Sequence, residues 1–396
     1  MPNSPEVAIP VLMLVVFAAA KAFSELFGRF GLPGLVGEIL AGVVIGPSLL
    51  NWIHPTPVLQ SLSELGVLFL LFNVGLEVRS SELLKVGGTA FLVATIGVFV
   101  PLVMGWGIMR LWGFPQVESI FVGAALVATS VGITAQVLRA KQKLHERSSQ
   151  IILAAAVIDD VLGLIVLAVV SGSAHGNVHP WEIALTATLP VAFMILLAKW
   201  GSHGVRHAIP HLESRLTSSE SQFHISIVLL FALSVLSMYT GVAAIVGAFL
   251  AGMSLGESVG KRVHTLVHGT TELLVPFFLV GIGLKIDIGV FRDRSTLLLT
   301  LVILAAAVVS KLIGCGAGAI HLGFDDALKV GFGMVPRGEV GMVVAQLGLA
   351  MGALTRPIYG VVVFTALATT LVAPTLLNLA YRQSAPVPAP APALGD

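Results

Sequence analysis

The chain has 396 residues, of which 56% are hydrophobic and only 11% are charged. Soluble globular proteins carry charge on roughly 25% of their residues, so this composition excludes a soluble enzyme or binding protein. The formal net charge of +1 argues against nucleic acid as a partner, because surfaces that bind nucleic acid concentrate basic residues. The single cysteine, Cys315, lies in an apolar run and is expected in the protein core. Because the sequence has no Cys/His cluster at metal-ligand spacing, we expect no resident metal or cofactor.

The apolar residues lie in stretches of about twenty, the length that crosses a bilayer core of about 30 Å as a helix. Within hydrocarbon, each backbone N–H and C=O needs a partner in its own segment, so these stretches must be helical. They predict an all-α polytopic membrane protein with thirteen transmembrane helices, over residues 7–27, 33–51, 61–78, 86–111, 117–138, 149–172, 181–200, 222–239, 241–258, 264–285, 292–319, 326–351 and 355–380. The start MPNSPEVAIP lacks a basic region and a cleavage site, so we expect the first span to be retained. Residues 383–396, rich in Pro and Ala, are expected to be a disordered tail.

Basic residues in the loops predict the orientation, because cytoplasmic loops are enriched in Lys and Arg. If the N-terminus lies outside, fifteen of the 22 basic residues face the cytoplasm: Lys21, Arg29, Arg79, Lys85, Arg139, Lys141, Lys143, Arg147, Lys199, Arg206, Arg215, Lys261, Arg262, Lys329 and Arg382. Five face the opposite side: Arg110, Lys285, Arg292, Arg294 and Arg356. The other two, Lys311 and Arg337, lie within predicted spans. We therefore expect an N-out, C-in topology.

An internal repeat relates the two halves of the chain. Six residues of the second predicted span match six of the ninth at a constant offset of 210, namely Gly37, Leu40, Ala41, Gly42, Gly46 and Ser48 with Gly247, Leu250, Ala251, Gly252, Gly256 and Ser258. Further along, Gly75–Leu76–Glu77 aligns with Gly283–Leu284–Lys285. Because the matched spans are an odd number apart, the two copies would run in opposite directions through the membrane. We expect inverted repeats of six spans each, joined by one linker helix (6+1+6).

Two predicted spans are interrupted at equivalent places in the two repeats. Thr129 and Ser130 interrupt the fifth, and Pro336, Arg337 and Glu339 interrupt the twelfth, where the proline removes a backbone donor. Paired interruptions of this kind point to the midplane site of a transporter, so we predict two crossed broken helices. Thr129 and Ser130 could lend oxygens to a cation or cap a broken helix. Arg337 and Glu339 could pair with each other or compensate the helix dipoles at the break.

Asp159 and Asp160 lie deep in the sixth predicted span, in AAAVIDDVLGLIVLAVV. A carboxylate at the bilayer centre costs a few kcal/mol or more, which marks such acids as functional. Adjacent residues point about 100° apart on a helix, so the two acids can have different partners. Lys311 lies about as deep in the eleventh span and needs a carboxylate, and one of the two aspartates is the natural partner.

These three residues suggest a minimal mechanism. With protonated Lys311 tied to Asp159, Asp160 remains a carboxylate that takes either a proton or a small hard cation. Competition for that one carboxylate is the simplest form of antiport, and release of the Lys311 proton on cation binding would make the exchange electrogenic. Four other acids lie nearer the span ends, where we expect them to be solvated or interfacial: Glu38, Glu64, Glu77 and Glu272.

In the segments that carry these residues, the chain resembles the cation/proton antiporter-2 family, and closely its NapA-type bacterial Na+/H+ antiporters. The segments are GEILAGVVIGPSLL at 37–50, LFNVGLE at 71–77, ALVATSVGITAQVL at 125–138, AAAVIDDVLGLIVLAVV at 154–170, PFFLVGIGLKIDI at 276–288 and VPRGEVGMVVA at 335–345, together with Lys311. The resemblance covers essentially the whole chain.

The resemblance implies a homodimer that works by alternating access in the bacterial cytoplasmic (inner) membrane. It implies one transporter unit over residues 1–382, made of a dimerisation domain at about 7–78 and 222–285, a linker helix at about 181–200 and a core ion-translocation domain at about 86–172 and 292–380. Carried over to this chain, Asp160 would bind the transported Na+ or Li+, and Asp159 would pair with Lys311. Thr129 would belong to the first crossover. The Asp-Asp pair implies electrogenic rather than electroneutral exchange.

Other functions stay open on the sequence alone. A K+/H+ antiporter of the same family, or a Na+-coupled symporter, would use the same kind of site. An intramembrane enzyme is a remote alternative, because such proteases need their acids on separate facing helices and Lys311 would repel a divalent metal. An ion channel is disfavoured by the competing lysine and the inverted repeats. We therefore expect a transporter that is not an enzyme.

Overall fold

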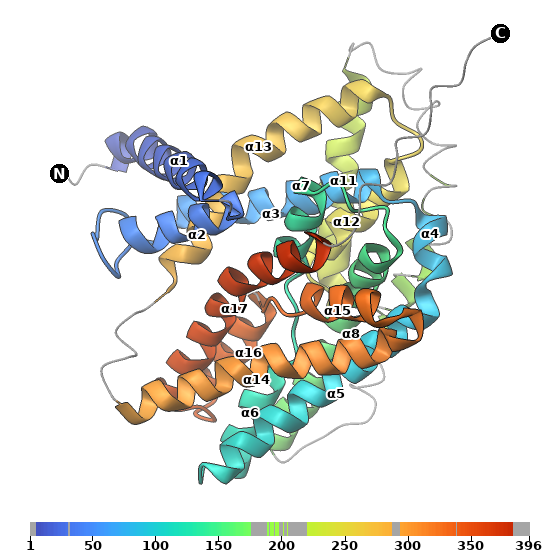
Figure 1. Ribbon diagram of the computed structural model, residues 1–396. Coiled ribbons are helices and arrows are strands. Elements are labelled where there is room, and N and C mark those ends of the chain that lie inside the picture. Colours follow the sequence, from blue (N-terminus) through green and yellow to red (C-terminus); the bar gives the residue numbers. More distant parts are fainter. Residues whose placement is uncertain are drawn as a thin grey trace.

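The computed structural model describes residues 5–30, 32–175, 220–286, 294–337 and 339–382, with short pieces between residues 188 and 204. Within these residues all regular structure is helical (Figure 1). The helices are α1 (Pro5–Arg29), α2 (Gly34–Ile45), α3 (Pro57–Glu77), α4 (Ser80–Lys85), α5 (Gly87–Leu111), α6 (Gln116–Ala125), α7 (Val131–Ala140), α8 (Arg147–His175), α11 (Ser221–Tyr239), α12 (Ala244–Leu255), α13 (Lys261–Leu284), α14 (Arg294–Ala319), η3 (Ile320–Leu322), α15 (Phe324–Gly333), α16 (Glu339–Ala350) and α17 (Arg356–Arg382).

In the described part of the chain, eight helices are long and apolar enough to cross a membrane. They are α1, α3, α5, α8, α11, α13, α14 and α17, and α2 and α12 are shorter apolar helices. This result confirms the predicted all-helical, multi-pass membrane architecture. The predicted linker at residues 181–200 lies mostly outside the described residues, and the predicted tail at 383–396 lies wholly outside them.

The second predicted span is shorter as a helix than the sequence suggested. It was expected to reach residue 51, but α2 ends at Ile45. The chain then folds back, with the amide of Asn51 donating to the carbonyl of Gly46 at 2.8 Å, and Asn51 takes a positive φ of 55°. The apolar run therefore overstated this helix, because its last residues form a hydrogen-bonded loop in which Leu49, Leu50 and Trp52 are exposed.

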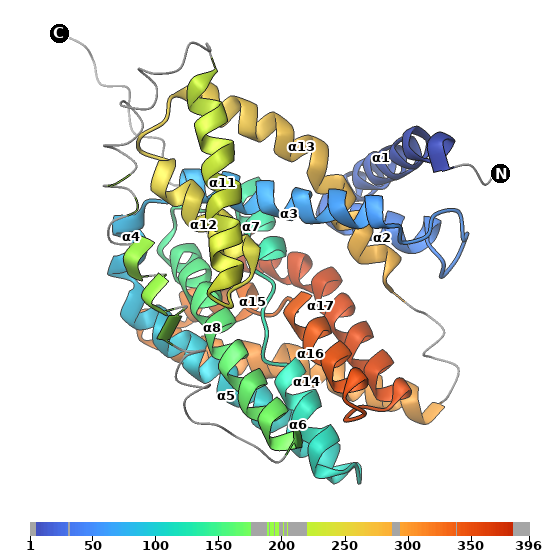
Figure 2. The ribbon, with the colours of Figure 1, turned by 180° about the vertical axis from the view of Figure 1, so that it is seen from behind.

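Helices α1–α3 pack with α11–α13, and we call these six helices the first group. In it α2 lies against α1 and α13, while α3 lies against α12 and α13 (Figures 1 and 2). Two glycines allow close backbone approach. A Cβ on Gly42 would overlap the carbonyl oxygen of Val280, and one on Gly75 would overlap that of Phe249.

Helices α5–α8 pack with α14–α17 and form the second group. Here α5 runs along α14, and α16 lies against α6 and α17. The groups meet where α7 contacts α3 and where α17 contacts α2. At the first of these places Gly132 of α7 faces Val67, Leu71 and Phe278 of the first group, so the contact there is apolar.

Candidate ion-binding site

Two helix interruptions lie side by side in the second group. The first separates α6 from α7, and the second separates α15 from α16. The Ser130 amide donates to the carbonyl oxygen of Pro336 at 2.7 Å, and the Thr129 hydroxyl donates to that of Met334 at 3.4 Å. Thr134, one turn into α7, donates its hydroxyl to the Gly333 carbonyl at 2.7 Å. The breaks thus satisfy part of each other's backbone hydrogen bonding, as buried polar groups require.

Arg337 donates to further backbone acceptors, at the first break and on α14. The residue is 1% exposed. Its Nη1 donates to the carbonyls of Val127 at 3.1 Å and Ala128 at 3.4 Å, and its Nη2 donates to that of Ala307 at 2.8 Å. Carbonyls at the C-terminal end of a helix lack partners within it and carry partial negative charge, so a guanidinium with several donors suits the end of α6. Its own amide donates to the Thr369 hydroxyl at 3.0 Å.

Asp159 on α8 and Lys311 on α14 form a fully buried ion pair. Both side chains have no exposed area, and the Lys311 Nζ lies 3.0 Å from Oδ1 and 3.2 Å from Oδ2 of Asp159. Removing one partner of such a pair leaves an uncompensated buried charge, which costs about 3–5 kcal/mol. The lysine–acid pair expected from the sequence is therefore present, with Asp159 as the partner.

Asp160 follows Asp159 on α8 and is shielded from solvent as well, with 6% of the residue exposed and its Oδ2 atom buried. One turn earlier on the same helix, Val157 lines a narrow apolar hollow together with Leu71 of α3, Val131 of α7 and Phe249 of α12. The two described hydrogen bonds of the Lys311 ammonium both go to Asp159. The site therefore holds two shielded acids and one amine, with apolar side chains of both groups nearby.

The structure describes the side chains of some of the other predicted site residues but not of all. Thr129 is 5% exposed, and its hydroxyl is engaged at the break. Ser130 stands at the N-cap of α7 without a side-chain capping hydrogen bond. Glu339 begins α16, but its side chain lies outside the described part of the chain, as does its predicted pairing with Arg337.

Three of the acids that were expected to be solvated or interfacial make ion pairs. Glu38 is 6% exposed and lies 3.2 Å from the Lys21 ammonium. Glu77 lies 3.2 Å and Glu272 lies 4.0 Å from the guanidinium of Arg139. Glu38 is the exception in burial, because its side chain is shielded from solvent and paired with Lys21 of α1. Arg139 gave no functional signal in the sequence, because it is one of several basic residues at a span end.

Among the described residues, no group of three or more His, Cys, Asp and Glu side chains could hold a metal ion. Oxygen atoms are offered by the two adjacent carboxylates on α8 and, separately, by the Thr129 hydroxyl and the backbone carbonyls of the breaks. Hard monovalent and divalent cations prefer such oxygen ligands.

Comparisons with known proteins show the family of the chain. Residues 12–382 match the family described as "Sodium/hydrogen exchanger, transmembrane". The chain is 34% identical over 375 residues to the Na+/H+-K+ antiporter GerN of Bacillus cereus, covering 93% of this chain and 95% of that protein. It is 30% identical over 378 residues to a Na+/H+ antiporter of Enterococcus hirae, covering 93% and 96%.

A solved structure supports the fold. The sodium proton antiporter MjNhaP1 of Methanocaldococcus jannaschii superposes with a TM-score of 0.66 at 18% identity, over 95% of this chain and 98% of that one. At this identity the likeness bears on the fold alone. The family match and the two curated relatives, each covered over nearly its whole length, show that the chain belongs to the family of transmembrane sodium/hydrogen exchangers.

Proposed function

We propose that this protein is a secondary active Na+(Li+)/H+ antiporter in which the cation and the proton compete for Asp160. The observation that carries the proposal is the buried Asp159–Lys311 pair directly beside Asp160 on α8. Charges placed inside a membrane protein mark ion pathways and proton relays. The relatives named as Na+/H+ antiporters support the same conclusion.

The proposed roles follow from the buried ion pair. The Lys311 ammonium pairs with Asp159, so we assign the exchanged ion to Asp160. A proton and a Na+ ion would both bind at the Asp160 carboxylate, and binding of one excludes the other. Thr129 and the interrupted backbone supply further oxygens, while Arg337 holds the two breaks together by its bonds to Val127, Ala128 and Ala307.

Exchange is proposed to be electrogenic. When Na+ binds the acid pair, Lys311 releases its proton, so that two protons leave for one cation taken up. A net charge then crosses the membrane in each cycle, and each 100 mV of potential contributes about 2.3 kcal/mol.

The proposed architecture has thirteen spans, inverted repeats and an N-out, C-in orientation. Its support lies in the first group, where the repeat pairs α2 with α12 and α3 with α13. The contact of α2 with α13 at Gly42 and Gly283 then corresponds to the contact of α12 with α3 at Gly252 and Gly75. We further propose that the first group is the dimerisation domain of a homodimer in the bacterial inner membrane and that the second group is the moving core.

K+/H+ exchange is the second candidate. One relative carries K+ as well as Na+ in its name, the Na+/H+-K+ antiporter GerN. The same acid pair would serve K+, because backbone oxygens of the breaks adapt to a larger ion more readily than a rigid cage.

The test is cation-driven proton movement in proteoliposomes, comparing wild type with Asp160→Asn and with Asp326→Asn as a matched control. The control makes the same change, Asp to Asn, at an acid whose side chain is 34% exposed and which lies at the start of α15. Na+ or Li+ should collapse a pH gradient in wild type and in the control but not in Asp160→Asn. Equal activity in Asp160→Asn would overturn the assigned site, and activity with K+ alone would replace the substrate.

A further inference from the structure

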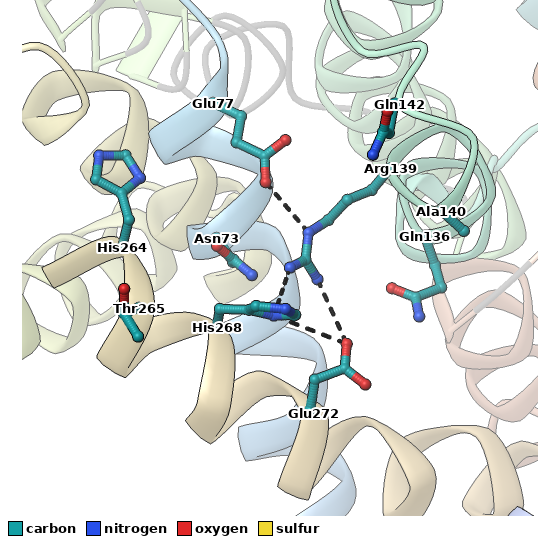
Figure 3. A pocket seen from close by; sticks show the side chains of 10 residues that line it. All are labelled: Asn73, Glu77, Gln136, Arg139, Ala140, Gln142, His264, Thr265, His268 and Glu272. Atoms are coloured by element: carbon teal, nitrogen blue, oxygen red, sulfur yellow. Dashed lines mark hydrogen bonds and ion pairs between the residues drawn. The ribbon is translucent and has the colours of Figure 1, made fainter. Parts of the chain in front are cut away.

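A polar pocket of about 500 Å³ lies between the two helix groups. It is bounded by α3 and α13 of the first group and by α7 of the second (Figure 3). Its mouth is open to solvent, since the side chains of His268 and Glu272 are 54% and 56% exposed. On the predicted orientation, this is the cytoplasmic face of the protein.

Arg139 reaches across this pocket from α7. Its Nε lies 3.2 Å from Glu77 Oε1 on α3, its Nη1 lies 4.0 Å from Glu272 Oε1, and its Nη2 donates to His268 Nδ1 at 2.8 Å, both on α13. With the Asn73 amide turned so that its oxygen faces the guanidinium, that oxygen accepts from Nη2 at 2.7 Å and from Nη1 at 3.1 Å. Figure 3 shows the guanidinium pointing from α7 toward these side chains of α3 and α13.

This bridge joins the two groups, whereas two other ion pairs of the described residues each stay within one group. Arg262 pairs with Glu220 at 3.0 Å inside the first group, and Lys329 pairs with Asp326 at 3.6 Å inside the second. The Arg139 side chain is 13% exposed, whereas that of Arg262 is 69% exposed, so the contacts of Arg139 are less screened by water than the Arg262–Glu220 pair. Because one rigid, planar guanidinium carries all the bonds of the bridge, a movement of α7 against α3 by a few ångströms would stretch them together.

We propose that Arg139 is a latch that holds the conformation in which this pocket is open, and that it releases Glu77 and Glu272 whenever the second group moves against the first. The proposal deepens the proposed antiport function and rests on it for the movement. The latch stabilises one of the two access states and leaves the chemistry at Asp160 unchanged. Loss of the Arg139 latch lowers the population of the state in which this pocket is open, relative to the state that is open to the other side of the membrane.

The latch predicts opposite effects at the two membrane faces. Apparent affinity falls with the population of the state that binds, so losing the latch raises the Na+ KM at the pocket face and lowers it at the other face. In proteoliposomes of known protein orientation, we expect Arg139→Gln to raise the ratio of these two KM values by about threefold to tenfold. Glu77→Gln should raise the ratio in the same direction but by less, because it removes one of the contacts of Arg139, and the double variant should add little to Arg139→Gln alone.

The matched control is Arg262→Gln, which removes a salt bridge to Glu220 within the first group. It should leave the KM ratio at the wild-type value. The latch proposal is overturned if Arg139→Gln changes the Na+ KM equally at both faces or at neither face. It is also overturned if Arg139→Gln changes the KM ratio no more than Arg262→Gln does.

A second measurement separates failure of the latch from failure of the antiport assignment. Gln136 on α7 lines the pocket, so Gln136→Cys in a Cys315→Ala background reports access through it with a membrane-impermeant maleimide. Glu77→Gln, which keeps the shape of the side chain, should slow this labelling, and Glu220→Gln should not. If Glu77→Gln slows labelling although the protein shows no cation-driven proton movement, the latch is supported and only the assignment of antiport is overturned. Unchanged labelling and an unchanged KM ratio in an active antiporter would overturn the latch alone.

Discussion

Arg337 donates a hydrogen bond of 2.8 Å to the carbonyl oxygen of Ala307, one helical turn before Lys311 on α14. The same guanidinium reaches the carbonyls of Val127 and Ala128 in the interruption after α6. One buried cation therefore joins the helix that carries the proposed amine to the first interruption. We infer that Arg337 fixes the position of α14 relative to the breaks.

Replacing Arg337 should destabilise the protein strongly. Arg337→Gln leaves buried carbonyls at the breaks without donors, and each such group costs about 1–3 kcal/mol. We expect a loss of roughly 2–4 kcal/mol in unfolding free energy, measured as a drop in thermal unfolding temperature in detergent. Arg337→Lys should recover only part of it, because one ammonium cannot serve carbonyls on two helices.

The control for this change is Arg110→Gln. Arg110 donates to the Phe114 carbonyl at 2.7 Å in an exposed position, so its loss should cost less than about 1 kcal/mol. An Arg337→Gln variant as stable as Arg110→Gln would show that water replaces the guanidinium at the breaks.

The Asp159–Lys311 pair should behave as one unit in stability. Asp159→Asn and Lys311→Gln each leave a charge without its partner and should cost about 3–5 kcal/mol. The double variant removes both charges and should be less destabilised than the sum of the single ones. Thermal unfolding of the four proteins measures this coupling, and simple additivity of the two losses would contradict a direct interaction.

Lys311 should also determine whether exchange responds to membrane potential. If its proton is the second one exchanged, Lys311→Gln removes net charge movement while Asp160 still exchanges one cation for one proton. We expect uptake of labelled Na+ driven by an imposed potential to fall to the level without potential, while uptake driven by a pH gradient persists. Potential-driven uptake that survives at full size in Lys311→Gln would refute this role.

The helices and the acid pair could be predicted from sequence for a simple physical reason. A backbone in hydrocarbon must be helical, and buried charges such as Asp159, Asp160 and Lys311 are rare enough to be noticed. The breaks were visible because Pro336 and the polar pair Thr129–Ser130 interrupt apolar runs.

The latch residues could not be predicted in the same way. Arg139 meets Glu77 across 62 residues and His268 across 129 residues of sequence. At span ends, such charges are common and usually solvated, so only the tertiary packing of α7 on α3 and α13 distinguishes them. Glu38 shows the same limit, because its burial depends on the packing of α1 against α2.

Close packing in the first group leads to a further prediction. A Cβ on Gly75 would overlap the carbonyl oxygen of Phe249, and one on Gly252 would overlap that of Phe72. Gly75→Ala or Gly252→Ala must push α3 and α12 apart, and overpacking of this kind costs about 1–3 kcal/mol. Gly107→Ala in α5, where a Cβ meets nothing within 4 Å, should be neutral or slightly stabilising in the same unfolding assay. Equal stability of all three variants would show that α3 and α12 adjust without cost.

The last prediction concerns the space beside Lys311. A Cβ on Gly97 of α5 would overlap the Sγ of buried Cys315, while it would lie 3.7 Å from the Lys311 Nζ and 3.9 Å from the Cys315 Cβ. Gly97→Ala should therefore displace α14 at the turn after Lys311, lowering stability by about 1–3 kcal/mol and slowing exchange. Cys315→Ala removes the sulfur and leaves only ordinary contacts, so the double variant should regain both properties, which unfolding and proteoliposome transport would measure. A double variant no better than Gly97→Ala would mean that the defect arises from the glycine backbone and that the packing against α14 does not matter.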